Sequence, residues 1–144
     1  MPRRVVLSGA SGLIGRALAA SLRADGVAVT TLVRRAPRAA DEVRWLTDDR
    51  PLDPEVLAGA DAVVNLNGAN IGRLPWTPSY RSTLLWSRIT PTRTLATALR
   101  ALGENTPLLV SASGAGFYGS APGRMLDETS PRGGTFLAEL CSEW

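Results

Sequence analysis

The feature that most constrains the fold of this chain is a glycine-rich turn between an apolar run and a helical pattern. The apolar run covers residues 5–7, and apolar residues at helical spacing follow the turn over residues 13–22. Gly9, Gly12 and Gly15 recur at intervals of three across this junction. This order predicts a buried strand, a tight turn and a helix, because each segment has the apolar period of its own element.

The rest of the chain alternates apolar runs with helical patterns. Short runs bounded by turn residues predict further strands over residues 27–33, 43–46, 62–66 and 108–111. Continuously apolar strands separated by helices are typical of a parallel sheet that is covered on both faces. We therefore expect an α/β fold, namely the N-terminal part of a Rossmann-type doubly wound parallel sheet with about five strands.

Helical segments are expected between and after these strands. Asp53 is a good N-cap for a brief helix with proline in its first turn. Pro91 lies inside a longer pattern and is expected to kink that helix or divide it near residues 89–90, because proline lacks a backbone N–H. The expected helices cover residues 53–59 and 84–99 and begin again at residue 135, after a loop over residues 113–134.

The composition indicates one globular domain over residues 1–144 and excludes several chemistries. Hydrophobic residues make up 44% and charged residues 20% of the chain, as in ordinary folded domains. There is no histidine, and Cys141 is the only cysteine. Neither a disulfide within the chain nor a Cys/His metal site is therefore expected, and a reducing, cytoplasmic location fits. No stretch reaches the length of a membrane span, so no membrane partner is expected.

The basic character of the chain is weak evidence for a nucleic-acid partner. The sequence pI is near 10, but the net charge is only +3 and the arginines are scattered. An anionic small ligand explains this balance as well as a nucleic acid does. We therefore expect a small-molecule partner and no nucleic acid.

The glycine turn has the spacing of a dinucleotide-binding turn. Gly9 allows the tight turn, Gly12 lets a pyrophosphate approach the backbone, and Gly15 lets the helix pack against the strand. The helix N-terminus adds unpaired N–H groups and a positive dipole end. A glycine-rich turn without a ligand is the alternative, but the position of the turn inside a βαβ unit favours the dinucleotide.

The end of the second expected strand indicates which dinucleotide is bound. NAD-specific proteins usually place a carboxylate there, about twenty residues after the turn, for the ribose hydroxyls. This chain has Arg34, nineteen positions after Gly15, followed by Arg35. A guanidinium can form paired hydrogen bonds to a 2′-phosphate, so NADP(H) is favoured over NAD(H). The alternative is that both arginines are solvated loop charges.

Three motifs together resemble those of the extended short-chain dehydrogenase/reductases. They are the glycine turn, the segment Asn-Leu-Asn-Gly-Ala-Asn-Ile at 65–71, and the segment Ser-Ala-Ser-Gly-Ala-Gly-Phe-Tyr-Gly at 111–119. More narrowly, the chain resembles the atypical subgroup of nucleoside-diphosphate-sugar epimerases in the NAD-dependent epimerase/dehydratase superfamily. Shorter matches extend the resemblance over essentially the whole chain, at 76–77, 87–88, 127–131 and 136–138.

The resemblance implies a set of NADP contacts, to which we add Arg35 and Ser111 at the ends of two strands. The expected cofactor-binding residues are Gly9, Ser11, Gly12, Leu13, Ile14, Gly15, Val33, Arg34, Arg35, Leu66, Asn67, Gly68, Thr83, Arg88 and Ser111. From position alone, the 67–68 turn would lie at the mouth of the fourth strand, where a cofactor crosses the switch point of the sheet. The alternatives are a core role for Leu66 and a solvated helix face for Arg88.

The resemblance also implies a catalytic group. In the family, a Ser or Thr after the fifth strand works with a Tyr-x-x-x-Lys pair on the next helix, where the lysine lowers the tyrosine pKa. Ser113 occupies the serine position, with Ser111 or Gly114 as alternatives. Tyr118 is the nearest phenol and is our candidate for proton transfer, and a structural aromatic is the alternative reading of it.

This chain departs from the family pattern in two respects. The expected Tyr and Lys positions hold Phe136 and Leu140, and the chain has no lysine. Extended members also continue with further strands and a C-terminal substrate domain, so we expect a truncated domain without substrate recognition. A sheet edge exposed by the truncation is expected to promote homo-oligomers.

Two functions remain open from the sequence. The first is an NADP(H)-binding domain of an epimerase- or reductase-like enzyme that acts on a sugar nucleotide or a similar small molecule. The second is a catalytically inactive nucleotide-binding module, either a pseudo-enzyme or a fragment. Neither the substrate nor the type of reaction follows from the sequence.

Overall fold

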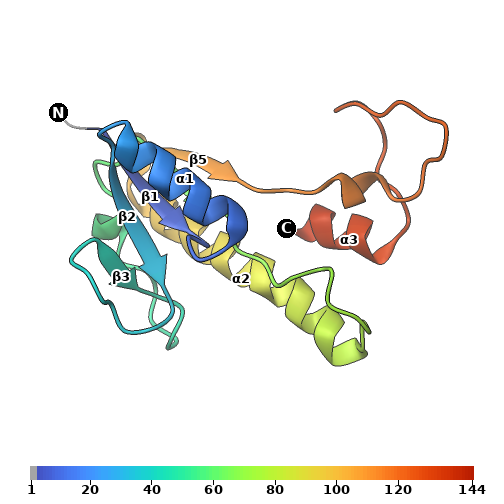
Figure 1. The fold of residues 1–144 in the computed structure, drawn as a ribbon, viewed down its shortest axis with the longest axis horizontal. Helices are drawn as coiled ribbons and strands as arrows, with labels where there is room; N and C mark the ends of the chain where they lie inside the picture. Colours follow the sequence, from blue (N-terminus) through green and yellow to red (C-terminus); the bar gives the residue numbers. More distant parts are fainter. Residues whose placement is uncertain (1–2) are drawn as a thin grey trace.

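Five parallel strands form one sheet in the computed structural model, which describes residues 3–144. The strands are β1 (Arg4–Ser8), β2 (Ala28–Val33), β3 (Glu42–Arg44), β4 (Ala62–Asn65) and β5 (Leu108–Ser111). Their order across the sheet is β3-β2-β1-β4-β5 (Figure 1). The strand order reverses between β1 and β4, as in a Rossmann-type sheet, and the predicted fold class is confirmed.

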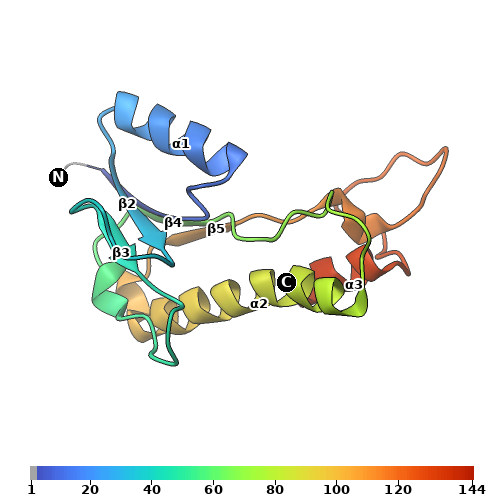
Figure 2. The same cartoon turned by 60° about the horizontal axis from the view of Figure 1, so that its bottom comes forward.

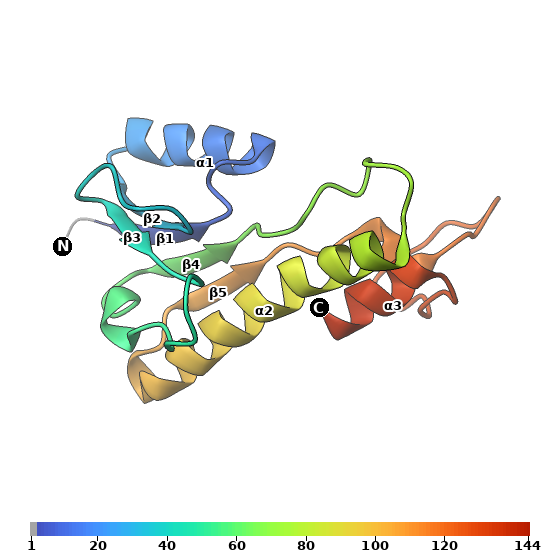
Figure 3. The same ribbon diagram turned by 90° about the horizontal axis from the view of Figure 1, so that it is seen from below.

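Two helices lie on opposite faces of this sheet. Figures 2 and 3 show α1 (Leu13–Ala24) on one face and α2 (Pro78–Ala101) on the other. A third helix, α3 (Phe136–Glu143), lies beside the N-terminal part of α2, beyond the carboxyl ends of the strands. Among residues 3–144, none of these helices combines the length and the apolar composition that crossing a membrane requires.

Each face of the sheet has its own apolar core, because successive residues of a strand point to opposite faces. Val6 of β1 and Val63 of β4 belong to the core on the α2 side, which includes Leu95. Leu7, the next residue of β1, packs instead in the core that includes Ala19 of α1. These two layers hold the carboxyl ends of β1, β2 and β4 together at one edge, where the site described below lies.

Helix α2 is not divided at Pro91, contrary to one of the two outcomes expected from the sequence. It is one continuous helix of 24 residues with Pro91 in its interior. Leu84 and Ile89 before the proline and Leu95 and Leu99 after it are all buried. Apolar packing on both sides of Pro91 therefore outweighs the lost backbone hydrogen bond and the steric clash of the ring, which together cost about 3 kcal/mol in a helix interior.

Several boundaries differ from those expected. The third strand ends at Arg44 rather than residue 46, because Leu46 has a φ of 54°, outside the extended region. The brief helix expected over residues 53–59 is a single 3-10 turn, η1 (Pro54–Val56), capped by Asp53. The structure also has 3-10 turns at η2 (Gly103–Asn105) and, inside the expected loop, at η3 (Ala115–Tyr118).

The α1 face of the sheet is not covered over β5, although we expected both faces to be covered. Val110 is aligned with Val64 of β4, which is aligned with Leu7, so these residues lie on the α1 face. Helix α1 contacts β1 and β2, and Leu108 and Val110 remain 66% and 47% exposed. Strand β5 is therefore an apolar edge strand within residues 3–144.

Candidate functional site

The turn between β1 and α1 uses glycine for two different steric reasons. Gly9 has a φ of +78°, and a Cβ there would lie 2.6 Å from the carbonyl carbon of Leu66. A Cβ on Gly15 would lie 2.3 Å from the carbonyl oxygen of Gly9 and 2.7 Å from the Cα of Ala10. The first helical turn thus rests directly on the turn that precedes it, and Gly9 has the tight-turn conformation predicted for it.

Gly12 differs from these two glycines because space surrounds it. It is the N-cap of α1, and a Cβ there would meet only the Gly9 carbonyl oxygen, at 3.5 Å. No side chain caps this end of α1, and none of its first-turn residues is acidic. The helix therefore presents uncapped N–H groups and its positive dipole end beside an open backbone, as an anion-binding turn requires.

A cavity of about 670 Å³ opens beside this turn. It extends from the turn past the end of β2 to the turn that follows β4. The predicted cofactor residues that line it are Gly9, Ser11, Gly12, Val33, Arg34, Arg35, Leu66, Asn67 and Gly68. The predicted residues that do not line it are Leu13, Ile14, Gly15, Thr83, Arg88 and Ser111. The structure thus gathers nine predicted residues from three distant segments around one cavity.

The predicted residues outside the cavity lie in different surroundings. Leu13 and Ile14 are 81% and 68% exposed at the start of α1. The Thr83 hydroxyl, on the exposed side of α2, donates to the Ser79 carbonyl at 3.2 Å. The Ser111 hydroxyl accepts a hydrogen bond from the Asn65 amide at 3.2 Å.

The wall of the cavity is strongly cationic. Arg16 and Arg23 of α1 join Arg34 and Arg35 in lining it, and Glu42 is the one acidic residue among the lining residues. Within residues 3–144, the Arg34 side chain forms no hydrogen bond or ion pair, whereas Arg35 is paired with Glu42. Arg34 is therefore the guanidinium at the end of β2 that is available to a ligand.

A buried polar network joins the carboxyl ends of β1, β4 and β5. Ser8 and Asn65 are completely buried. The Asn65 side-chain oxygen accepts from the Ser8 hydroxyl at 3.1 Å and from the Asn67 amide at 2.8 Å. Its side-chain nitrogen donates to the hydroxyls of Thr92 and Ser111 at 2.9 and 3.2 Å. Asn65 therefore fixes the turn that carries Asn67 into the cavity.

Asn65 is a residue that the sequence analysis did not assign a role. One signal was present, since an amide side chain interrupts the otherwise apolar run over residues 62–66. A buried amide must find partners for both of its polar atoms. Partners as distant in sequence as Ser8, Thr92 and Ser111 cannot be read from such a local pattern.

Arg88 lies beneath the turn at Gly68 rather than on a solvated helix face. Its guanidinium donates to the carbonyl oxygens of Leu84 and Ala69 at 2.8 and 3.1 Å and stacks on the Trp144 ring at 5.2 Å. A Cβ on Gly68 would lie 2.8 Å from the Arg88 Cζ, so the guanidinium fills the space of a side chain there. Burial lowers the pKa of Arg88 below its ordinary value. The expected contact of Arg88 with NADP stays a prediction.

The two catalytic candidates lie outside the cavity. Ser113 is exposed in the segment between β5 and η3. The Tyr118 hydroxyl donates to the Asp127 carbonyl at 2.8 Å, and its ring packs edge-on against Phe117 at 5.3 Å. This contact gives Tyr118 a structural partner in the loop after η3, and its role in proton transfer stays a prediction.

The positions expected to hold the Tyr-x-x-x-Lys pair are occupied by apolar packing. Phe136 lies 5.9 Å from the Trp76 ring, and the Arg81 guanidinium lies 5.3 Å above Phe136. Leu140, one helical turn later, is buried. Neither side chain can hold or move a proton, so α3 contributes packing at the positions where the resemblance places chemistry.

Comparison with known proteins identifies the family. Residues 5–136 match the NAD dependent epimerase/dehydratase family. This chain belongs to that family. An epimerase family protein of Mycobacterium bovis is 44% identical over 140 residues, which are 97% of this chain and 46% of that protein. This member of the epimerase/dehydratase family therefore spans about half the length of the relative that it matches.

Two solved structures of similar fold hold nicotinamide cofactors. The human epimerase family protein SDR39U1, solved with NADPH, has a TM-score of 0.78 and 31% identity, and the match covers 98% of this chain and 47% of that one. MoeE5, solved with UDP-glucuronic acid and NAD, has a TM-score of 0.74 and 26% identity, covering 97% and 46%. The epimerase/dehydratase fold predicted from the motifs is confirmed.

Proposed function

We propose that this chain is the NADP(H)-binding part of an epimerase- or reductase-like enzyme that acts on a sugar nucleotide or a similar small molecule. The observation that carries the proposal is the cationic cavity that begins at the glycine turn and reaches Arg34 at the end of β2. The open backbone at Gly12 and the uncapped start of α1 suit a pyrophosphate. The family assignment supports a nicotinamide dinucleotide as the ligand.

The choice of NADP(H) over NAD(H) rests on Arg34. Its guanidinium lines the cavity and forms no ion pair within residues 3–144. A guanidinium in this position attracts a 2′-phosphate and offers paired donors to its oxygens. When the cofactor is bound, its nicotinamide supplies hydride transfer, and the protein supplies binding and orientation. The 66–68 turn, held by Asn65, would carry the part of the cofactor that crosses the switch point.

The proposal is tested by titrating the purified chain with NADPH and with NADH and following the nicotinamide fluorescence. Hydrogen bonds to charged groups contribute about 1.5–3 kcal/mol, so Arg34→Ala should weaken NADPH binding roughly 10- to 100-fold. NADH binding should change little. Arg124→Ala, at an exposed loop arginine outside the cavity lining, is the matched control. Failure of the unmodified chain to bind either cofactor would refute the proposal.

A catalytically inactive nucleotide-binding module is the second candidate function. The observation that favours it is the apolar packing of Phe136 and Leu140 where the family resemblance expects Tyr and Lys. Incubation with UDP-glucose and NADP⁺, followed by NMR of the sugar, separates the two functions. Turnover that disappears in Tyr118→Phe, and also in Ser113→Ala, would reject the inactive module and assign the proton transfer to these residues.

A cytoplasmic location belongs to the same proposal. It rests on the single cysteine, Cys141, because a chain that forms no internal disulfide suits a reducing compartment. Cell fractionation followed by immunoblotting tests it, and recovery of the protein in a membrane or secreted fraction would contradict it.

A further inference from the structure

Glu42 occupies a position from which a carboxylate could select against NADP(H). It is the first residue of β3, paired in register with Thr31 of β2, and it lines the cavity together with Arg34. Its side chain is only 15% exposed. An accessible carboxylate at this end of the sheet would accept hydrogen bonds from ribose hydroxyls and repel a 2′-phosphate, which is the arrangement of NAD-specific sites.

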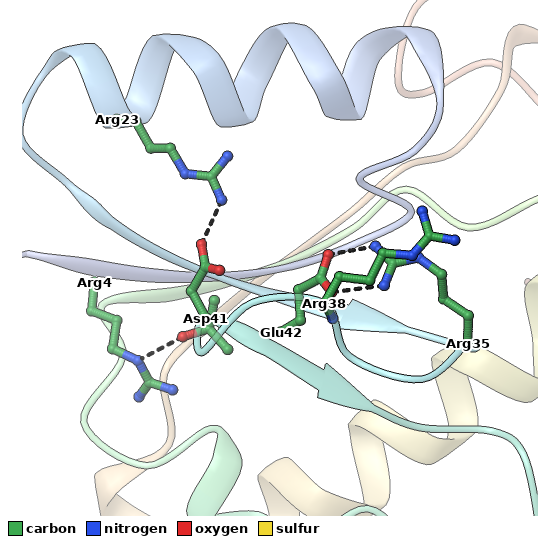
Figure 4. Close-up of polar contacts among 7 residues, drawn as sticks. Arg4, Arg23, Arg35, Arg38, Asp41 and Glu42 are labelled. Carbon is green, nitrogen blue, oxygen red and sulfur yellow. Dashed lines mark hydrogen bonds and ion pairs between the residues drawn. The ribbon is translucent and has the colours of Figure 1, made fainter.

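Both oxygens of that carboxylate are already bound. Arg35 Nη1 donates to Oε2 of Glu42 at 2.7 Å, and Nη2 donates to Oε1. The backbone N–H of Arg38 also donates to Oε2, at 2.6 Å. Figure 4 shows Arg35 and Arg38 converging on Glu42. The pair is bidentate and therefore nearly neutral when seen from the cavity.

The neighbouring acidic residue is neutralised in the same way. Arg23 of α1 donates to the Asp41 carboxylate at 2.8 Å (Figure 4). Two consecutive acidic residues, of which Glu42 lines the cavity, are thus each paired with an arginine. Arg34 then provides the unpaired positive charge at the end of β2.

We propose that the Arg35–Glu42 pair is a cofactor-selectivity device, in which Arg35 acts by masking the Glu42 carboxylate rather than by holding the 2′-phosphate itself. Arg35 is therefore a positioning residue, and Glu42 is a latent determinant for NAD(H). Loss of Arg35 would expose a carboxylate that accepts ribose hydroxyls and repels a 2′-phosphate. This inference rests on the proposed NADP(H) function.

The test compares affinities for NADPH and NADH in Arg35→Ala, Glu42→Gln and the double variant. Unmasking Glu42 should lower the NADPH to NADH affinity ratio roughly tenfold in Arg35→Ala, as expected for a unit charge several ångströms from a phosphate near the surface. The double variant should return the ratio to about the original value, because the repelling charge is gone. Glu42→Gln alone should raise the ratio, since Arg35 is then a second free cation.

The same set of variants is titrated with 2′,5′-ADP and 5′-AMP by calorimetry, which reports the 2′-phosphate without the nicotinamide. Arg38→Ala is the matched control, because the Arg38 hydrogen bond to Glu42 comes from its backbone N–H, which alanine keeps. If Arg35→Ala does not fold, as judged by circular dichroism, Arg35→Gln takes its place.

Two results would overturn the inference while leaving the proposed function intact. One is an unchanged ratio in Arg35→Ala. The other is a lowered ratio that the double variant fails to restore, which would mean that Arg35 holds the phosphate itself or only orders the loop. If the unmodified chain binds neither cofactor nor 2′,5′-ADP, the proposed function falls, and the inference falls with it.

Discussion

Replacement of Gly15 by alanine has two opposing effects on stability, a gain from helix propensity and a loss from a steric clash with a neighbouring segment. Gly15 lies inside α1, where alanine is favoured over glycine by about 1 kcal/mol. The added Cβ would lie 2.3 Å from the Gly9 carbonyl oxygen, against an ordinary contact of 3.4 Å or more. The atoms that this Cβ would meet, in Gly9 and Ala10, belong to the backbone, so the start of α1 must move outward by about 1 Å. Forced shifts of this kind cost about 1–3 kcal/mol.

We expect the steric cost to exceed the gain in helix propensity, with a net loss of about 2 kcal/mol in the free energy of unfolding. The upper end of the steric cost applies because Gly9 cannot move away. Its backbone lies so close to Leu66 that a Cβ added to Gly9 would be 2.6 Å from the Leu66 carbonyl carbon. Urea denaturation followed by tryptophan fluorescence measures the change. Gly134→Ala, where no atom lies within 4 Å of the added Cβ, should change stability by less than about 0.5 kcal/mol. A gain of stability in Gly15→Ala would refute the reasoning.

Three further predictions concern the buried network, the ion pair and the sheet edge. Asn65→Ala should lower the free energy of unfolding by about 3 kcal/mol, because its buried hydrogen-bond partners are left unsatisfied. Asn105→Ala, at an exposed position, should lower it little, and urea denaturation measures both changes. The hydrogen bond from Arg35, with that from the Arg38 backbone N–H, lowers the pKa of Glu42 from 4.5 to about 2. Because the pKa of Glu42 is lower in the folded state than in the unfolded state, the ion pair stabilises the fold above pH 4.5, and this stabilisation is lost as the pH falls toward 2. In Glu42→Gln, the free energy of unfolding should decline less over this pH range in an acid titration. The chain should form homo-oligomers through the exposed apolar edge of β5, and Val110→Lys should disrupt them. Elution of the unmodified chain as a monomer at all concentrations in gel filtration would contradict this.

The pattern of elements was readable because it depends on neighbours in sequence. The strand at 108–111 was predicted with its observed bounds, and the helix beginning at 135 is observed from Phe136, with Thr135 as its cap. The glycine turn was located for the same reason, since its spacing and the apolar periods around it are local. Leu46 shows the limit of this reasoning, because a positive φ at an apolar residue has no local signature.

The sequence by itself determined the fold class, the family and the segments that meet at the cavity. The tertiary structure alone decided which groups in those segments are free to act. It pairs Arg35 with Glu42 and leaves Arg34 unpaired, although the two arginines are adjacent in sequence. It also buries Asn65 among partners up to 57 positions away. Hydrogen bonding and burial depend on such distant contacts, which the order of residues along the chain does not reveal.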